Sequence, residues 1–157
     1  INHITDLKFI EKLYAAASEG VKIKMLVRGQ LSMIPTLPFL HGNIEITGIV
    51  DKYLEHSRIF IFCNNNEEKY YISSADWMTR NLDFRIEVAM PVYEKTIQKE
   101  LKTVVEYGLK DNVKAYICDG SGENIKKQKD EPLFRSQKEL MIHYRDLEAG
   151  KASSDRL

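Results

Sequence analysis

Three segments of the chain repeat apolar residues at the three- and four-residue spacing of an amphipathic helix. Asp6 is placed as the N-cap of the first, because its carboxylate precedes the first apolar position. Ser136 and Glu139 form a capping-box pair at the start of the last. The pattern predicts helices over residues 7–18, 94–109 and 136–147.

Runs rich in Val, Ile, Phe and Tyr predict β-strands between these helices. The predicted strands span residues 21–27, 44–50, 58–63, 69–73, 84–90 and 113–118. The third and fourth flank a short polar turn of three asparagines, which predicts a hairpin. Residues 119–132 have almost nothing to bury, and we expect a mobile loop there.

A helix–strand opening, a β-rich middle and a helix–strand close favour the α/β class. We expect one domain over residues 1–150, with a mixed β-sheet flanked by helices, and a tail over residues 151–157. The chain opens on Ile1 and not on Met, so we expect it to be a piece of something longer.

Composition supports a single globular domain, with 157 residues, 43% of them hydrophobic and 29% charged. Lys plus Arg and Asp plus Glu both total 23, so no overall field attracts the chain to nucleic acid or to an anionic membrane. We expect no transmembrane segment, because no apolar run approaches about 18 residues. Cys63 and Cys118 lack the spacing of paired metal ligands, and we expect two buried thiols.

Arginine is concentrated in the first 85 residues, where Arg28, Arg58, Arg80 and Arg85 lie. A guanidinium group stays charged and binds phosphate oxygens in a planar, two-point contact. Arg28 follows a predicted buried strand, and ligands of open α/β sheets bind at strand ends. The alternative is a surface arginine paired with a carboxylate.

His56 and Arg58 are two residues apart at the entrance to a predicted strand, so their side chains project to the same face. Together they can address one phosphoryl group, with the imidazole as nucleophile or proton carrier and the guanidinium neutralising charge. His143 and Arg145 share this spacing, but on a helix it turns them apart, so His143 is interpreted as structural.

Hydroxyl and carboxylate side chains follow the hairpin at Ser73, Ser74 and Asp76. They are candidates either for phosphate contacts or for capping a short helix that starts near Trp77. Glu87 is a candidate for orienting an imidazole, with a salt bridge as the alternative. The sequence contains neither common form of Gly-rich phosphate loop, and no metal ligands are assigned.

Two stretches, YLEHSRIFIF and YYISSADWMTRNLDFRIEVAMP, resemble the C-terminal domain of bacterial polyphosphate kinase. That domain is the last of two phospholipase-D-like domains in the enzyme. The segments ITDLKFIEKLYAAASEGVKIKMLVRG, NIEITGIVDKYLEHSR and FRSQKEL fit in the same order, so the similarity covers nearly the whole chain.

The resemblance implies a phospholipase-D-like fold and a kinase that moves the terminal phosphoryl group of ATP reversibly onto inorganic polyphosphate. The family reaction passes through a phosphohistidine in the preceding domain, outside this chain, and uses Mg²⁺ whose ligands are not in this segment. By resemblance, Arg28 and His56 contact the nucleotide phosphates, and His56 assists proton or charge transfer. Arg85 lines the phosphate tunnel, and Arg58 stands where the wider superfamily has lysine.

The resemblance further implies ATP or ADP and polyphosphate as ligands, the remaining domains of the same enzyme as partners, a homo-oligomer, and no nucleic acid. The implied location is cytoplasmic, with membrane association of the full-length enzyme as an alternative. By itself the fragment is expected to be inactive. Two other functions stay open: half of a phospholipase-D-type phosphodiesterase or nuclease site, and a non-catalytic assembly module.

Overall fold

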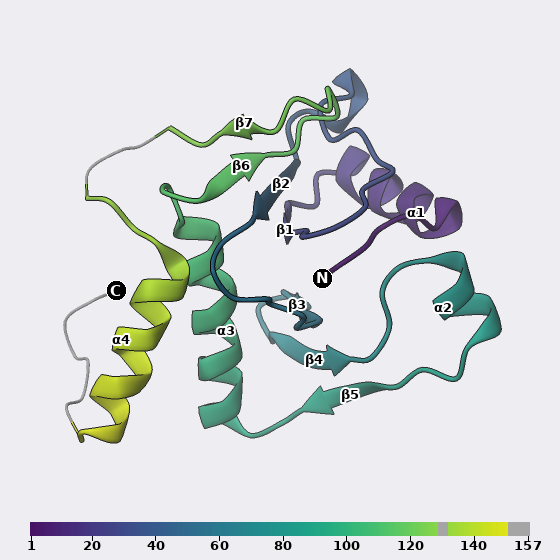
Figure 1. The fold of residues 1–157 in the computed structure, drawn as a ribbon. Helices are drawn as coiled ribbons and strands as arrows, with labels where there is room; N and C mark the ends of the chain where they lie inside the picture. Colours follow the sequence, from purple (N-terminus) through teal and green to yellow (C-terminus); the bar gives the residue numbers. More distant parts are fainter. Residues whose placement is uncertain (129–131, 151–157) are drawn as a thin grey trace.

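The computed structural model describes residues 1–128 and 132–150, which form two β-sheets with helices packed against them (Figure 1). The helices are α1 Leu7–Ser18, α2 Thr79–Phe84, α3 Lys95–Lys110 and α4 Ser136–Glu148, with one 3-10 turn at Pro38–Leu40. The strands are β1 Ile23–Leu26, β2 Ile44–Ile49, β3 Ile59–Phe62, β4 Lys69–Ser73, β5 Ala89–Val92, β6 Ala115–Ile117 and β7 Ile125–Lys126.

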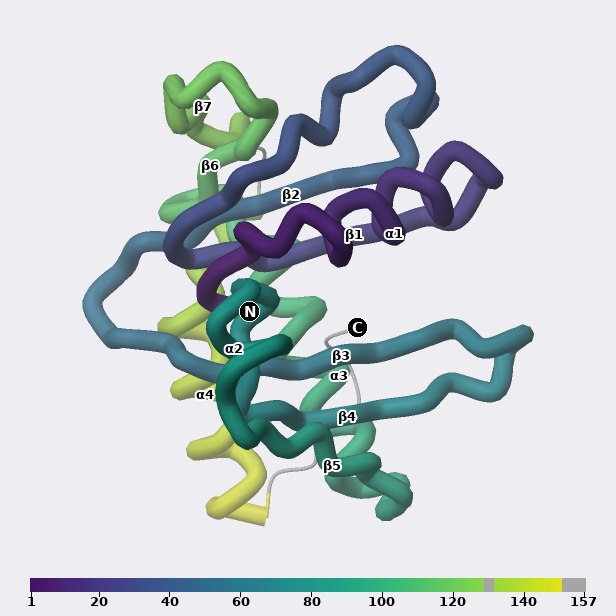
Figure 2. The backbone as a smooth tube through the Cα atoms, turned by 90° about the vertical axis from the view of Figure 1, so that its right-hand side faces the viewer, coloured from purple at the N-terminus to yellow at the C-terminus, as the bar shows by residue number. Residues whose placement is uncertain are grey.

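The first sheet has the strand order β1-β2-β6-β7, and the second has the order β3-β4-β5. Strands β1 and β2 run parallel, with Ile23 opposite Ile44, whereas every other pair is antiparallel. The predicted mixed α/β fold is therefore confirmed, but its strands divide into two sheets where one was expected. Figure 2 shows the two groups of strands as separate layers.

Residues 1–5 connect the two sheets at one end. On one side, the amide of Ile4 donates to the carbonyl of Gln30 at 2.9 Å. On the other side, Trp77 donates its amide to the carbonyl of His3 at 3.0 Å, and Thr5 donates to the carbonyl of Trp77 at 2.8 Å. Helix α3 contacts both β1 and β3 and so spans the sheets on a different side, with α4 packed against α3.

The main core lies between α1 and the first sheet. Its buried residues are Ile4, Ile10, Ala17, Met25, Val27, Met33, Leu40, Ile44 and Ile46. Helix α1 presents its apolar stripe to this core, and its N-terminus is capped as predicted, since Asp6 accepts the amide hydrogen of Phe9 at 2.9 Å. Burial of this stripe is what stabilises the helix against the sheet.

The strand predicted over 84–90 is wrong in its first half, because Thr79–Phe84 forms α2 and pairing begins only at Ala89. Strand β5 continues through Pro91, which is tolerated at the outer edge of a sheet. The loop predicted over 119–132 contains β7, which pairs with β6; residues 129–131 and the predicted tail over 151–157 lie outside the described residues.

The capping box predicted for the last helix is also wrong. The N-cap of α4 is Arg135, whose side chain makes no capping bond, and Ser136 is the first helical residue. The amide and the hydroxyl of Ser136 both donate to Oδ2 of buried Asp111, each at 2.8 Å. A carboxylate from the end of α3 thus takes over the capping role. The cysteine prediction fails as well, since Cys63 is exposed and Cys118 is half-buried.

Candidate functional site

Asp76 is the centre of a polar network at the end of the second sheet, next to residues 1–5. Its side chain is only 6% exposed, and it receives Arg58 through two parallel hydrogen bonds, from Nε to Oδ1 and from a terminal nitrogen to Oδ2, both 3.0 Å long. The backbone amides of Asn2 and His3 donate to Oδ1 at 3.1 and 3.2 Å. Asp76 therefore fixes the direction of the Arg58 side chain.

Of the two alternatives for Asp76, helix capping is wrong, because α2 has Met78 as its N-cap and no side chain caps it. Burial acts to raise the pKa of Asp76, but the hydrogen bonds from Arg58, His3 and Asn2 outweigh burial and lower the pKa to about 2. The same hydrogen bond to Asp76 raises the pKa of Arg58 above its ordinary value, against the smaller effect of burial. Both groups are therefore charged at neutral pH.

His56 contacts the same terminal nitrogen of Arg58 as Asp76 does. The terminal nitrogen of Arg58 that bonds Asp76 is also 2.9 Å from Nε2 of the exposed His56 ring. The two-residue spacing thus places both side chains together, as predicted. A guanidinium group can only donate, so Nε2 accepts and the ring proton belongs on Nδ1, which is left to address a ligand.

Arg28 joins the network through a residue that the sequence analysis missed. It follows the end of β1, and one terminal nitrogen donates to Oδ1 of Asn2, whose own side-chain nitrogen is 3.4 Å from Oδ2 of Asp76. Nε of Arg28 is buried and has no hydrogen-bond partner among the described residues. No sequence signal marks Asn2, because its role depends on the pairing of residues 1–5 with distant strands.

Glu87 is held by two residues of the SSADWMTRN segment. The hydroxyl of Ser74 donates to Oε2, and the side-chain amide of Asn81 donates to Oε1 at 2.6 Å. Glu87 therefore does not orient the imidazole as suggested, and no salt bridge to it is found among the described residues.

The pKa of Glu87 reflects its two hydrogen bonds and the charges of two arginines. The hydrogen bond from Ser74, followed by that from Asn81, lowers the pKa of Glu87, and the charges of Arg85 and Arg58 lower it further. Arg85 itself is exposed. Of the four predicted phosphate-contacting side chains, Arg28, His56 and Arg58 share one hydrogen-bonded network, whereas Arg85 is not part of it.

The described residues offer no evident place for a metal ion in this region. Asp76 already accepts hydrogen bonds from Arg58, and Glu87 accepts them from Ser74 and Asn81. Across residues 1–128 and 132–150, no cluster of three His, Cys, Asp or Glu side chains has a metal-binding arrangement. The donor set therefore does not fit Mg²⁺. In the same residues no helix has the length and apolar character needed to cross a membrane.

Comparisons with known proteins agree with the resemblance. The family model for polyphosphate kinase C-terminal domain 2 matches residues 1–137. Polyphosphate kinase from Yersinia pestis is 44% identical over 119 residues, which are 76% of this chain and 17% of that protein. The Bacillus anthracis enzyme of the same name is 38% identical over 138 residues, covering 82% of this chain and 20% of that protein.

A solved structure extends the match to three dimensions. The crystal structure of polyphosphate kinase from Porphyromonas gingivalis superposes with a TM-score of 0.87 at 42% identity, covering 98% of this chain and 23% of that one. The chain thus spans about a fifth of the length of these relatives. On sequence and on fold, the chain belongs to the polyphosphate kinase C-terminal domain family.

Proposed function

We propose that this domain supplies half of a composite site at which a longer enzyme reversibly transfers the terminal phosphoryl group of ATP to inorganic polyphosphate. The observation that carries this proposal is the continuous network Arg28–Asn2–Asp76–Arg58–His56, which gathers two guanidinium groups and an imidazole. Family membership and the printed name of the relatives support the choice of substrates.

Phosphoryl transfer requires alignment of the reacting groups and neutralisation of charge, and little else from the protein. Arg28 and Arg85 supply positive charge to phosphate oxygens, and Arg28 keeps Nε unpartnered within the described residues. In Arg58, Nε donates to Asp76, and one terminal nitrogen donates to both Asp76 and His56. The other terminal nitrogen remains available to bind a phosphate oxygen.

His56 acts as a donor in this arrangement. With Nε2 accepting from Arg58, the Nδ1 proton points to a phosphate oxygen and stabilises negative charge on it. The phosphohistidine and the Mg²⁺ ligands lie in other parts of the longer enzyme. The ligands of this domain in our proposal are ATP or ADP and polyphosphate. Its protein partners are the remaining domains and further copies of the longer enzyme, which works in the cytoplasm.

Calorimetric titration tests the proposal, with polyphosphate and with ATP–Mg²⁺ at two salt concentrations. Weak, salt-sensitive binding is expected for this chain, and loss of that binding is expected in the Arg28→Ala/His56→Ala variant. Arg145→Ala is the matched control, because Arg145 is exposed on α4, outside the network.

Two results would contradict the proposal. The first is binding that survives Arg28→Ala/His56→Ala or falls equally in the Arg145→Ala control. The second is ATP-dependent polyphosphate synthesis by this chain alone, since the nucleophile is assigned to another domain. A chain that binds neither ligand would favour an assembly role.

A further inference from the structure

The loop over residues 50–58 joins β2 to β3 and carries His56 and Arg58 of the polar network. Residues 54–57 are exposed. The bond between His56 and Arg58 is the only hydrogen bond that residues 54–57 make to any described residue. The position of His56 therefore depends on how residues 50–53 are held.

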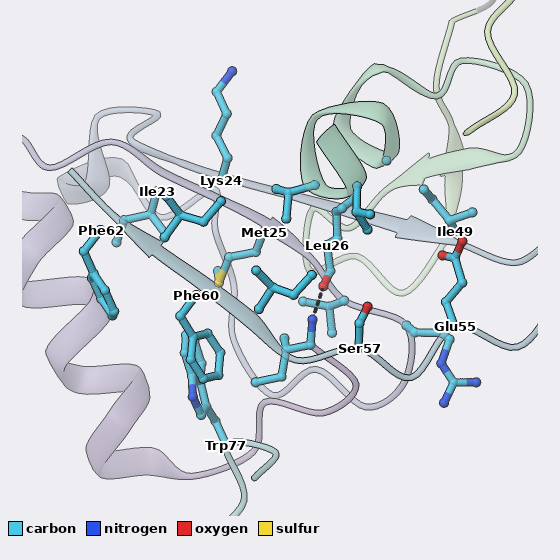
Figure 3. Close-up of a pocket in the computed structure, with 18 of the residues that line it drawn as sticks. Ile23, Lys24, Met25, Leu26, Ile49, Glu55, Ser57, Phe60, Phe62 and Trp77 are labelled. Atoms are coloured by element: carbon cyan, nitrogen blue, oxygen red, sulfur yellow. Dashed lines mark hydrogen bonds between the residues drawn. The ribbon is translucent and has the colours of Figure 1, made fainter. Parts of the chain in front are cut away.

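The neighbours of His56 in the sequence point away from the network. Glu55 and Ser57 line an apolar cavity of about 390 Å³, in which Figure 3 shows Ser57 near Leu26. His56 and Arg58 are not part of this lining. Because side chains of an extended chain alternate, both project to the opposite face, and the backbone of the loop sets the direction of the His56 ring.

The first contact that holds the loop is an ion pair. Arg135, the N-cap of α4, donates from Nε to Oδ2 of Asp51 at 2.8 Å, and one terminal nitrogen donates to Oδ1. The Asp51 side chain is only 2% exposed. The hydrogen bond from Arg135 lowers the pKa of Asp51 against the effect of burial, so both groups are charged at neutral pH. A buried two-point contact of this kind fixes the loop at residue 51.

The second contact is made by an amide side chain. Gln137 lies in the first turn of α4 and is only 7% exposed. Its Oε1 accepts the backbone amide hydrogen of Tyr53 at 2.9 Å, and its Nε2 donates to the carbonyl of Tyr53 at 2.8 Å. Gln137 thus pairs with Tyr53 as a facing residue does in an antiparallel ladder, and it fixes the backbone three residues before His56.

Residues 134–137 are themselves fixed to the segment that follows α3. Asn112 donates its amide to the carbonyl of Phe134 at 3.0 Å and accepts the amide hydrogen of Phe134 on Oδ1 at 2.7 Å. Ser136 donates twice to buried Asp111. Alternate residues of this segment therefore bond the end of α3 and the loop. The segment is the start of FRSQKEL, which has no role in the network itself.

We propose that Arg135 and Gln137 are positioning residues for the phosphate site. They hold residues 51 and 53 on α4, and so keep the His56 ring against Arg58 with Nδ1 directed to a phosphate oxygen. The identity of the ligand rests on the function proposed above, whereas the placement of the His56 ring does not. The effect of Arg135 and Gln137 on binding passes through His56.

¹⁵N NMR of the histidine rings tests the proposal without a ligand. At a pH where the His56 ring is neutral, the shifts of Nδ1 and Nε2 report which nitrogen carries the proton. We expect the proton on Nδ1 in the original chain. In Gln137→Leu the two shifts should move toward each other, because the ring leaves Arg58. The signals of His56 are assigned by their loss in His56→Gln.

Gln98→Leu is the matched control. Gln98 is 8% exposed on α3, and its Nε2 donates to the carbonyl of Val92 at 2.7 Å, near the hairpin end of the second sheet. This variant loses a buried amide-to-backbone bond of the same kind, so it should lower the Tm to a similar extent and leave the His56 shifts unchanged.

Arg135→Lys is a milder second variant. It keeps a positive charge beside Asp51 but loses the two-point contact, so a smaller change in the His56 shifts is expected. If Gln137→Leu does not fold, Arg135→Lys carries the comparison with Gln98→Leu.

Calorimetry with ATP–Mg²⁺ at low salt measures the consequence for binding. Gln137→Leu is expected to raise the Kd about fivefold, whereas in a chain that already carries His56→Ala the same substitution should leave the Kd unchanged. A purely structural role of Gln137 would weaken binding in both backgrounds.

Three results would overturn the proposal: unchanged His56 shifts in Gln137→Leu, equal changes in Gln98→Leu, or an equal loss of affinity with and without His56→Ala. Failure of the original chain to bind ATP–Mg²⁺ or polyphosphate would contradict the function proposed above. The His56 shifts would then still decide whether Arg135 and Gln137 position the ring.

Discussion

Replacing Asp76 by Asn removes the charge at the centre of the arginine network while keeping the side chain's size. In the folded original chain the pKa of the Asp76 carboxyl is about 2, below its ordinary 3.8. At about 1.4 kcal/mol per pKa unit, this difference means that ionised Asp76 stabilises the folded state by about 2 kcal/mol. An Asn side chain also turns a donor toward Arg58 in place of an acceptor. We expect Asp76→Asn to lower the free energy of unfolding by about 2–3 kcal/mol.

Urea denaturation at several pH values measures this effect. Because the folded-state pKa of Asp76 is depressed, its contribution is complete above about pH 4 and is lost as the pH falls from about 4 to about 2. The variant should therefore approach the original chain in stability across that window. Asp83→Asn is the control, since exposed Asp83 is 3.9 Å from Lys8 and its loss should cost under about 0.5 kcal/mol.

A double-mutant cycle with Arg58→Gln isolates the contribution of the pair. A coupling energy near zero, or an Asp76→Asn variant within about 0.5 kcal/mol of the original chain at pH 7, would refute the assignment of Asp76 as the anchor of Arg58.

Three further predictions concern the scaffold. Asp111→Asn should lower the free energy of unfolding by about 2 kcal/mol and the Tm by roughly 5 °C, since the carboxylate accepts five hydrogen bonds; an unchanged melting curve contradicts this. Burial, followed by its hydrogen bond to Glu68, raises the pKa of Tyr70 to about 12, so stability should fall as the pH rises from about 10 to about 12. Burial also raises the pKa values of Tyr116 and Tyr144, so ultraviolet titration should lose one late-ionising phenol of several in Tyr70→Phe. Gly48→Ala places a Cβ 2.1 Å from the Tyr116 ring, so a loss of about 1–3 kcal/mol is expected by urea denaturation, with partial recovery in Gly48→Ala/Tyr116→Ala.

Periodicity predicted the bounds of α1 and α3 well, because both helices are amphipathic. The same reasoning failed at residues 84–90, where apolar residues alternate but meet no core: Ile86 is fully exposed and Phe84 is 81% exposed. Alternation indicates a strand only when one face is buried, and burial depends on neighbours that the local pattern does not contain.

The site was predicted in part for a similar reason. His56 and Arg58 are close in sequence, so their spacing alone indicated that they act together, and they are 2.9 Å apart. The roles of Asp76 and Asn2 depend on contacts between residues 74 positions apart, which no local pattern reveals. Ser136 illustrates a different error. Ser136 and Glu139 have the spacing of a capping box, but Ser136 instead donates to Asp111, a carboxylate 25 residues away in the sequence.

The side chain of Asn2 limits how position 2 can change during evolution. It offers an acceptor to Arg28 and a donor to Asp76, so the position is selected for hydrogen-bond polarity and not for volume. Aspartate would place a second carboxylate against Asp76, and leucine would remove the acceptor of Arg28 and one of the donors to Asp76. A substitution at position 2 should therefore be accompanied by substitutions at positions 28 and 76, and otherwise all three residues should stay unchanged.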